Sequence, residues 1–374
     1  MTVGGGRAAL SRFSCRGKYL ARSRRIRLSM LSGIKIWFLK SPWEDCELLG
    51  RKTGDYLRRE FADYDCATAA CAEECSAERE EINVYLPLDM PLVTVEDLAR
   101  GVECLRRRRL SVLHLGKGTG AEIRFGEGTD GGYFLTSPHF CKVNGAKSLN
   151  LVYNQMKERI IDRLLAAEVD VADAANTVID DTVKIFPGAR ILPFCRLCGA
   201  TVVAGGATVE SSYVADSIIE EGASVVMSHV VDSRVGACAA VGPFARLRGA
   251  DVGENCRVGD FVEIKASRLA DGVKSAHLAY VGDADVGAGT NIGCGAVFCN
   301  YDGCRKHRTQ VGEGCFIGAN VNLVAPLTVA DGAYVAAGTT VTEDVGKNDF
   351  VIGRSRQQNK KKNDGADVVG NRKP

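Results

Sequence analysis

Four short polar clusters in the second half of the chain carry the side chains that could do chemistry. They are Pro243–Arg248, Phe261–Lys265, His277–Tyr280, and Asn291 together with Asn300–Gly303. Arg248 and Lys265 are cations able to hold a phosphate group. His277 can accept a proton near neutral pH, because an unperturbed imidazole has a pKa of about 6.5. These residue types fit anion binding beside a general base.

The alternative interpretation of any one of these residues is a solvated surface group. We interpret His229 in that way, since it lies alone on a regular part of the sequence. His277 differs, because it lies in an irregular segment between two basic clusters. An amine must lose a proton before it attacks a thioester, and a general base of suitable pKa contributes typically about 10²–10⁴-fold to such a step.

The clusters lie within an internal repeat in which aliphatic residues recur every six positions. The runs are Ile179, Ile185, Ile191, Leu197, Val203, Val209; Ile219, Val225, Val231; Val235, Val241, Leu247; Val252, Val258, Ile264; Tyr280, Val286, Ile292, Phe298; and Val311, Ile317, Leu323, Val329, Val335, Val341. A period of six fits short strands joined by corners, with three strands in a turn of about 18 residues. Turns stacked at about 4.8 Å make a parallel β-helix, here of about nine turns.

The repeat breaks in two places. Its phase slips through Lys265–Ala279, and the polar stretch Cys299–Arg308 separates Phe298 from Val311. A polar insertion cannot form the wall of a β-helix. We therefore expect 299–308 to leave the wall as a loop, and such loops often serve binding.

Upstream of the repeat, residues 82–168 have a mixed α/β pattern. It predicts a strand at Ile82–Pro87, a helix at Thr94–Arg108, strands near 111–115 and 121–125, and a helix over 148–168. Thr94 is the expected cap of the first helix, with Asp97 three residues on. The long helix has Leu149, Val152, Met156, Ile160 and Leu164 on one face, which we expect to pack against the first turn of the repeat. Residues 1–81 show no clear pattern.

Composition excludes several classes of protein. The 374 residues include 48 basic and 46 acidic side chains, a net charge of +2, so nucleic-acid binding is not expected. No apolar stretch reaches the roughly 20 residues of a membrane span. The 15 cysteines are odd in number, scattered and without a secretory signal, which favours the cytoplasm. We interpret Cys195 and Cys198, a lone CxxC pair, as two repeat positions.

The strings FVEIK, HLAYVGDA, CNYDG and LVAP, within about residues 170–360, resemble one known family. It is the bacterial bifunctional N-acetylglucosamine-1-phosphate uridyltransferase/glucosamine-1-phosphate acetyltransferase family, in its acetyltransferase half. The resemblance implies a left-handed parallel β-helix of hexapeptide repeats and a homotrimer with active sites between subunits. It also implies acetyl-CoA as donor and N-acetylation of glucosamine 1-phosphate, a step in the synthesis of the cell-wall precursor UDP-N-acetylglucosamine.

Carried over position by position, the resemblance assigns roles to individual residues. His277 matches the catalytic base, with Glu263 orienting its neighbours and Asn300 at the junction of amine and donor. The acceptor ligands would be Arg248, Lys265, Tyr280, Asn291 and Lys306, the last of these where a neighbouring subunit's loop reaches in. The acetyl-CoA contacts would be Cys294, Asn300, Tyr301, Ala319, Ala337 and Arg354. Cys294 and Ala319 replace the commoner Ala and Ser, and the proline usual after the position of Arg248 is missing.

The front half departs from the family. The family's uridyltransferase half opens with a strand and a glycine-rich loop, whereas here only three residues precede Gly4–Arg7. We interpret Gly116–Gly120 as a turn. Tyr85–Leu92 resembles the family's Y-G-D-x-P-L segment and places Asp89 at the magnesium carboxylate. We expect a truncated, degenerate nucleotidyltransferase-like domain without uridyltransferase activity, and Mg²⁺ only if that activity survives.

The expected organisation has five parts. They are a basic segment at 1–29, a degenerate α/β domain at 30–147, a linker helix at 148–170, the β-helix at 171–356 and a disordered tail at 357–374. The basic segment is either an organelle transit segment or sequence upstream of a true start at Met30. Two other functions stay open: another sugar or nucleotide-sugar acyltransferase on the same prism, and a non-catalytic trimeric partner. A metal-dependent hydratase would need three close histidines, which the five present do not offer.

Overall fold

The structure is a computed structural model that describes residues 31–75, 81–126 and 132–359. The basic N-terminal segment and all but the first three residues of the expected tail lie outside the described residues. The chain divides into two compact units, Met1–Lys184 with Leu197–Ala200, and Ile185–Arg196 with Thr201–Pro374.

The first unit contains a mixed six-stranded sheet in the order β4-β1-β5-β7-β6-β8. The strands are β1 (Ile34–Leu39), β4 (Cys66–Ala69), β5 (Ile82–Pro87), β6 (Val112–Leu115), β7 (Glu122–Phe125) and β8 (Phe134–Leu135). Only β7 runs antiparallel to its neighbours. The other elements are β2 (Glu47–Leu48), β3 (Arg51–Lys52), α2 (Thr53–Glu60), η1 (Ala72–Glu74), α3 (Val95–Arg108), α4 (Ala146–Ala166), β9 (Asp170–Val171) and β10 (Val178–Ile179).

The helices and strands predicted over residues 82–168 are confirmed. Strand β5 has the predicted bounds, and α3 begins at a reciprocal capping box between Thr94 and Asp97. Helix α4 buries Val152, Met156, Ile160 and Leu164, and it contacts β9 and β10. The β1–α2–β4 segment was not predicted, although the alternating Ile34, Ile36 and Phe38 of β1 are all buried.

A cluster of ion pairs around Asp181 ties three elements of the first unit together. Its Oδ2 accepts from Arg51 Nε at 2.6 Å and from Arg59, and its Oδ1 accepts from Arg163 Nη1 at 2.7 Å. Burial of the carboxyl raises the pKa of Asp181, but the hydrogen bonds and charges of these arginines outweigh burial, so its pKa falls below the ordinary value.

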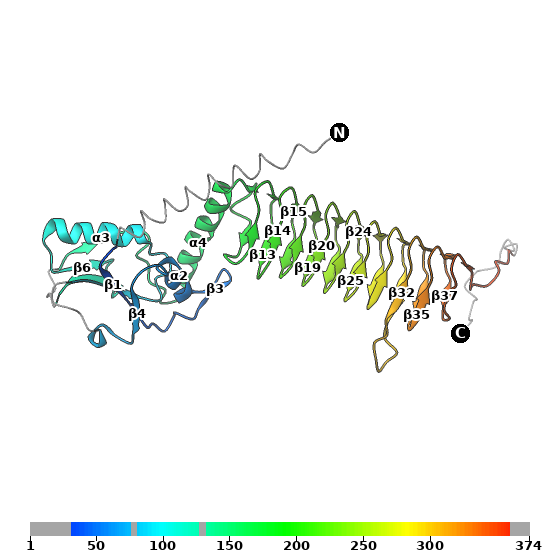
Figure 1. The fold of residues 1–374 in the computed structure, drawn as a ribbon, viewed down its shortest axis with the longest axis horizontal. Helices are drawn as coiled ribbons and strands as arrows, with labels where there is room; N and C mark the ends of the chain where they lie inside the picture. The colour runs from blue at the N-terminus through cyan, green and yellow to red at the C-terminus, as the bar shows by residue number, and fades with distance from the viewer. Residues whose placement is uncertain (1–30, 76–80, 127–131, 360–374) are drawn as a thin grey trace, which may run out of the picture. The chain divides into compact units, whose positions relative to one another are not determined.

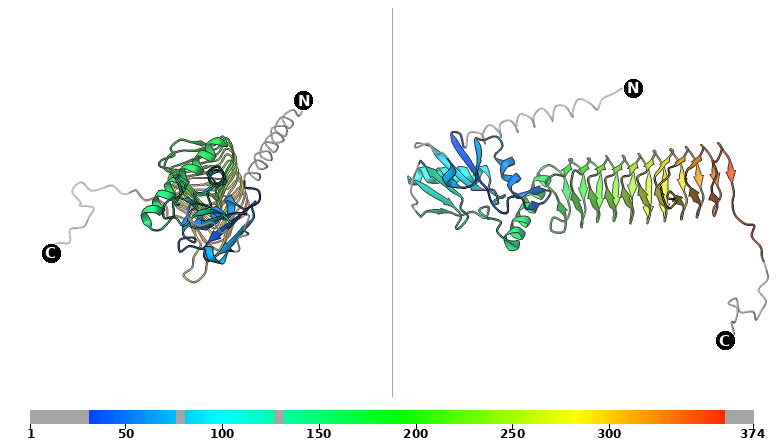
Figure 2. Two further views of the ribbon diagram at one scale, coloured as in Figure 1. Left: turned by 90° about the vertical axis from the view of Figure 1, so that its left-hand side faces the viewer. Right: turned by 90° about the horizontal axis from the view of Figure 1, so that it is seen from below.

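The second unit is a parallel β-helix built from three sheets (Figure 1 and Figure 2, right). One sheet holds β12 (Arg190–Ile191), β15 (Thr208–Glu210), β18 (Ser224–Val226), β21 (Ala240–Val241), β24 (Arg257–Asp260), β27 (Lys274–His277), β30 (Asn291–Ile292), β33 (Phe316–Ile317), β36 (Tyr334–Val335) and β38 (Phe350–Val351). We call it the first sheet.

The chain then passes to a second sheet and a third. The second sheet holds β16 (Tyr213–Ala215), β19 (His229–Val231), β22 (Arg246–Arg248), β25 (Glu263–Lys265), β28 (Tyr280–Gly282), β31 (Val297–Cys299), β34 (Asn322–Val324) and β37 (Thr340–Val341). The third sheet holds β14 (Val202–Val203), β17 (Ile218–Ile219), β20 (Arg234–Val235), β23 (Asp251–Val252), β26 (Arg268–Leu269), β29 (Ala284–Val286), β32 (Thr309–Val311) and β35 (Leu327–Val329). Strands β11 (Lys184–Ile185) and β13 (Arg196–Cys198) fall where the two units meet in the sequence.

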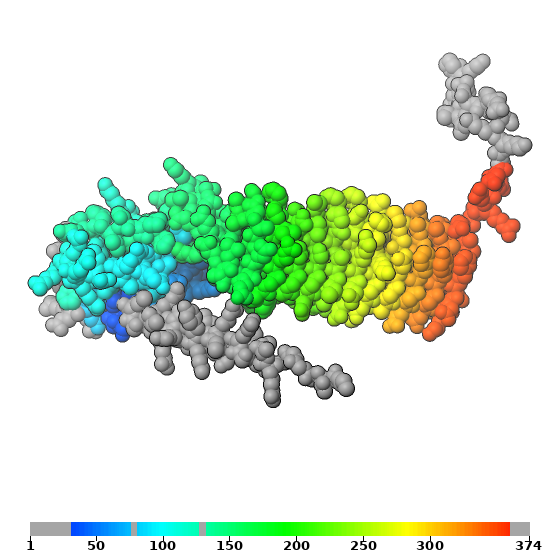
Figure 3. Space-filling view, turned by 90° about the horizontal axis from the view of Figure 1, so that it is seen from above, coloured from blue at the N-terminus to red at the C-terminus, as the bar shows by residue number. Residues whose placement is uncertain are grey.

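Most of the predicted aliphatic positions face inward and stack in register, but the inward residue of β19 is Val230 instead of the predicted Val231. Val209, Val225, Val241 and Val258 are successive partners in the first sheet, and each is at most 2% exposed. The expected 18-residue turn holds between Ile191 and Val209 but is wrong for the coils that follow directly. Val209 and Val225 are 16 positions apart and Val241 and Val258 are 17 apart, because some corners are shorter than the six-residue pattern allows. The stacked coils form a continuous surface in the space-filling view (Figure 3).

The predicted break at Lys265–Ala279 is wrong. This stretch forms β26 and β27, and Leu269 and Ser275 fill the inward positions at 1% and 0% exposure. A serine at an inward position hid the repeat. The inward residue of β28 is Val281 instead of the predicted Tyr280, which is half-buried.

The predicted loop is confirmed. The chain leaves the wall after Cys299 and returns at Thr309. Between them lies a short hairpin, residues 300–308, closed by an antiparallel bridge between Tyr301 and Lys306. It projects from the coil below the strands in Figure 1. Among the described residues, no helix has the length and apolar character needed to cross a membrane.

Candidate functional site

The predicted acceptor ligands come from neighbouring strands of the second sheet. Arg248 of β22 is the register partner of Lys265 in β25, which in turn pairs with Gly282 in β28. On the same face Glu263 pairs with Tyr280. Arg248 Nε donates to Glu263 Oε1 at 2.7 Å. The parallel register therefore brings together side chains that lie 15 to 17 positions apart in sequence.

Asp283 lies at the centre of this group. Its Oδ2 is 3.3 Å from Lys265 Nζ and accepts a hydrogen bond from Asn300 Nδ2. The same Asn300 amide lies 3.4 Å from Tyr280 Oη. Asn300 is only 8% exposed, so its amide is held in place. Lys265, Tyr280 and Asn300 were predicted as site residues, and Asp283 was not.

The 300–308 hairpin places Lys306 beside Lys265 of the same chain. Contact with the Lys265 ammonium lowers the pKa of Lys306. The turn is fixed by Asp302, whose Oδ1 accepts from the backbone N–H groups of Cys304 and Arg305 at 2.7 and 2.6 Å. At the hairpin base Arg308 makes a two-pronged ion pair with Asp285. The ammonium groups of Lys265 and Lys306 therefore lie close together, and a bound anion would reduce the repulsion between them.

His277 is the last residue of β27, on the first sheet. Its side chain is 58% exposed, and Nδ1 lies 3.9 Å from Oδ2 of Asp260, its register partner on the preceding coil. Three residues further on, the chain has turned the corner to Tyr280 of the second sheet. The imidazole is accessible and lies at the corner between the first and second sheets, whereas Lys265 and Asp283 lie at the far end of the second-sheet strands.

Several of the residues predicted to contact the donor lie one per coil along the same corner, and we call this row of residues the lane. Ser275, Ile292, Ile317 and Val335 are successive partners, which puts His277, Cys294, Ala319 and Ala337 at equivalent places on successive coils. Backbone bonds of 2.8 Å from Asn320 to Cys294 and from Gly338 to Ala319 continue the series. The Arg354 guanidinium donates to the carbonyl of Ala337. Cys294, Ala319 and Ala337 are exposed and small, so backbone groups are accessible along the lane.

Two predicted residues stand apart from the acceptor cluster. Asn291 opens β30 on the first sheet, in register with Lys274 and Phe316. Tyr301 is 60% exposed on the hairpin, where its hydroxyl donates to the carbonyl of Gly303 at 2.6 Å. In the single chain neither residue touches the Lys265–Asp283–Asn300 group through a described contact.

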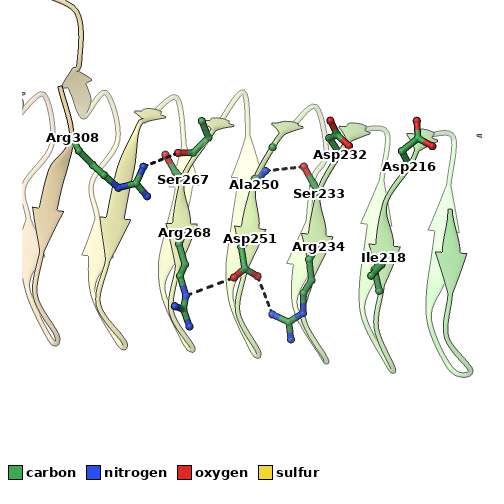
Figure 4. Close-up of a pocket in the computed structure, with 12 residues that line it drawn as sticks. Asp216, Ile218, Asp232, Ser233, Arg234, Ala250, Asp251, Ser267, Arg268 and Arg308 are labelled. Atoms are coloured by element: carbon green, nitrogen blue, oxygen red, sulfur yellow. Dashed lines mark hydrogen bonds and ion pairs between the residues drawn. The ribbon is translucent and has the colours of Figure 1, made fainter. Parts of the chain in front are cut away.

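Asp283 and Arg308 are the functional-site candidates that sequence reasoning missed. Asp283 lies inside the HLAYVGDA string, which was used only for the resemblance. Arg308 borders an open groove of about 560 Å³ on the third sheet, where Asp251 lies between Arg234 and Arg268 (Figure 4). Arg308 Nη1 also donates to the carbonyl of Ala266 at 3.2 Å, which fixes the hairpin base to the wall.

Asp89 of the first unit does not fit a magnesium site. Its carboxylate is fully buried, with Oδ2 accepting from Ser41 Oγ and lying 3.8 Å from Lys142 Nζ. Burial raises the pKa of Asp89. In 31–75, 81–126 and 132–359, no group of three His, Cys, Asp or Glu side chains is arranged to hold a metal ion. A lone buried carboxyl beside an ammonium is a poor ligand for Mg²⁺, which prefers several oxygen donors.

Comparisons with known proteins identify sequence relatives. No protein-family model matches the chain. It is 43% identical over 220 residues to the bifunctional protein GlmU of Brevibacillus brevis, which covers 58% of this chain and 48% of that protein. It is 43% identical over 230 residues to GlmU of an Exiguobacterium species, covering 60% and 51%. The chain spans about half the length of the curated relatives it matches.

Solved structures match parts of the chain at low sequence identity. A UDP-N-acetylglucosamine acyltransferase from Arabidopsis is 15% identical, with a TM-score of 0.25 over 48% of this chain and 68% of that chain. The enzyme of the same name from Campylobacter jejuni is 15% identical, with a TM-score of 0.22 over 45% and 68%. Similarity at this level carries no functional information. Over more than half of its length, then, the chain is similar in sequence to the bifunctional protein GlmU.

Proposed function

We propose that the protein is an acyltransferase of UDP-N-acetylglucosamine-related biosynthesis that transfers the acetyl group of acetyl-CoA to the amine of glucosamine 1-phosphate. The observation that carries the proposal is the meeting of two lysines, Lys265 and Lys306, on the second sheet, whose strand β28 begins three residues after His277. The similarity to GlmU over 58% of the chain supports the same reaction.

The acceptor phosphate would bind at the lysines. Lys265 and Lys306 repel one another, and Asp283 compensates only part of their charge. Arg248 adds a third cation, held by Glu263. A phosphate monoester carries about two negative charges near pH 7 and would offset this excess. Its sugar ring would then extend toward Tyr280 and the corner.

His277 would act as the general base. The imidazole takes a proton from the acceptor's ammonium group, and the free amine attacks the thioester carbonyl. The C–N bond forms, the C–S bond breaks, and the nitrogen loses its second proton, which passes to the leaving thiolate of coenzyme A. An exposed imidazole at the corner has the access this step requires. The acetyl-CoA itself would lie along the lane of Cys294, Ala319 and Ala337, with Arg354 at its far end.

We also propose that the working form is a homotrimer. At the corner occupied by Leu278, successive coils expose Phe244, Phe261 and Leu278 at 54%, 62% and 58%. All three have positive φ values, of 57°, 57° and 47°, a conformation that costs energy for residues other than glycine. The Phe244 and Phe261 rings stack at 5.4 Å. Exposed apolar ridges of this kind mark protein–protein contacts.

A thiol-release assay tests the reaction. Acetyl-CoA is supplied with glucosamine 1-phosphate and, in parallel, with free glucosamine or UDP-glucosamine. Thiol release with the phosphosugar alone supports the proposal. Release only with another acceptor assigns the protein to a different sugar acyltransferase reaction, and no release with any acceptor contradicts an enzymatic role.

A further inference from the structure

We propose that Asp283 is a positioning residue of this site, which holds the Lys265 ammonium and the Asn300 amide in one arrangement and thereby links acceptor binding to the donor side. The inference rests on the proposed function for its kinetic consequences, but its geometry is independent of it. Neither the sequence motifs nor the comparisons assign Asp283 a role.

The first support is convergence on one carboxylate oxygen. Oδ2 of Asp283 is 3.3 Å from Lys265 Nζ and also accepts from Asn300 Nδ2. Lys265 comes from the preceding coil and Asn300 from the base of the hairpin, and this carboxylate contacts both. The Lys265 and Asp283 side chains are just 16% and 20% exposed. Hydrogen bonds to an ionised group in such partly buried surroundings are strong and directional.

The second support is the space left beside the carboxylate. Gly282 precedes Asp283 in the column Arg248–Lys265–Gly282. A Cβ at Gly282 would lie 2.5 Å from Tyr280 Oη and 2.7 Å from Asn300 Nδ2. The absence of a side chain there lets Tyr280 and Asn300 approach each other over the backbone. Asp283 can then reach both the cation and the amide.

The third support is a comparison with the same corner in an earlier coil. Asp232 has the same left-handed backbone as Asp283, with φ values of 52° and 49°. Each donates its N–H to the carbonyl one coil back, Asp232 to Ala215 at 3.1 Å and Asp283 to Lys265 at 3.0 Å. A corner of this shape therefore does not by itself require the Asp283 contacts. Asp232 is a matched control for any effect on the corner.

The charge of Asp283 also acts on several neighbours. The groups that face it are Lys265 of β25, Tyr280 of β28, and Lys306 and Arg308 of the hairpin. The negative charge of Asp283 raises the pKa of both lysines, although contact with Lys265 keeps that of Lys306 below its ordinary value. Removing the charge by D283N should lower both pKa values. The lysines would then lose their protons at a lower pH.

The test compares wild type, D283N and D232N in the full chain. In D283N, kcat for glucosamine 1-phosphate should fall about 10-fold, because Asn300 loses its ionised acceptor. The alkaline limb of kcat/KM should move down by about one pH unit, which a purely structural role would not cause. D232N should match wild type. A D283N profile that coincides with wild type, or an equal effect in D232N, overturns the inference.

A binding measurement separates this inference from the proposed function. Calorimetric titration with inorganic phosphate at pH 7 and pH 9 needs no turnover. If wild type binds phosphate and D283N loses binding at a lower pH, Asp283 has the assigned role even where no acetyl transfer is found. If D283N and wild type lose phosphate binding at the same pH, the inference fails while acetyl transfer can still stand. A wild type that neither binds phosphate nor transfers acetyl contradicts both.

Discussion

Asp260 and His277 are register partners on adjacent coils, and Asp260 Oδ2 lies 3.9 Å from His277 Nδ1. The separation is too long for a hydrogen bond, but it places a negative charge beside the ring. In the proposed reaction, this carboxylate would lie beside the imidazolium that forms when His277 takes a proton. Both side chains are accessible, at 45% and 58% exposure, so substrate can reach the ring.

Replacing His277 by alanine should lower acetyl transfer at least 100-fold, because the base touches the reacting amine and no core residue. The trimer and the thermal melting curve should be unchanged. H229A is the matched control, since His229 stacks on Tyr213 at 4.7 Å on the second sheet. A kcat near wild type in H277A removes His277 from the mechanism.

Gly282→Ala should lower kcat/KM about 10-fold or more while the fold survives. The new Cβ would displace Tyr280 Oη and Asn300 Nδ2, which are ends of side chains, from their present hydrogen bonds without moving the backbone. G259A provides the contrast, because its Cβ would lie 2.1 Å from the backbone oxygen of Ala276. We expect G259A to lower the melting temperature and G282A to lower activity. Full activity in G282A would show that the placement of Tyr280 and Asn300 does not matter.

Asp181→Asn should destabilise the first unit by about 2 kcal/mol, less than the roughly 3–5 kcal/mol of a fully buried pair, because its arginine partners are partly exposed. The folded pKa of Asp181 is depressed, so its contribution is present above the unfolded value of about 3.9 and is lost as pH falls below it. Urea unfolding at pH 7 and pH 3 measures both effects. D55N, which breaks the exposed Asp55–Arg58 pair, should change stability by under about 1 kcal/mol. Equal effects of D181N and D55N would contradict the assignment.

Removal of residues 1–145 should leave the proposed trimer intact, because the stacked coils and their exposed ridge would supply both fold and contact. Helix α4 and its contacts with β9 and β10 are retained in this variant, although Asp181 loses Arg51 and Arg59. Light scattering on the shortened protein measures the mass. A monomer would show that the front segment is needed for assembly.

The protein should show little or no uridylyl transfer from UTP to N-acetylglucosamine 1-phosphate. A triphosphate requires a cradle of backbone N–H groups, a cation and metal-binding carboxylates acting together. Asp89 is buried between Ser41 and Lys142, and Gly116–Gly120 forms a turn closed by Thr119 Oγ1 on the carbonyl of Leu115 at 2.7 Å. Pyrophosphate release at ordinary enzyme rates, lost in D89A, would make the protein bifunctional.

The six-residue spacing by itself determined the β-helix, because stacked coils demand an aliphatic side chain at each inward position and leave that demand visible in the sequence. It also located the hairpin, since polar residues cannot form the wall. The capped helix α3 followed from Thr94 and Asp97 for an equally local reason. The motif strings supplied His277, Lys265 and Asn300 as candidates, but only through resemblance.

Only the tertiary structure determined which residues pair between neighbouring coils. A coil can contain 16, 17 or 18 residues, so sequence spacing alone could not show that Gly282 lies over Lys265 or that Asp283 faces Asn300. One coil was missed in the sequence because its inward position holds Ser275 and not an aliphatic residue. An inward position requires only a side chain that fits, and a small polar one such as serine fits there. The hairpin's return to Lys265 depended on the register of every coil before it. Residues that act together here are distant in sequence, and the parallel stacking of the wall is what brings them together.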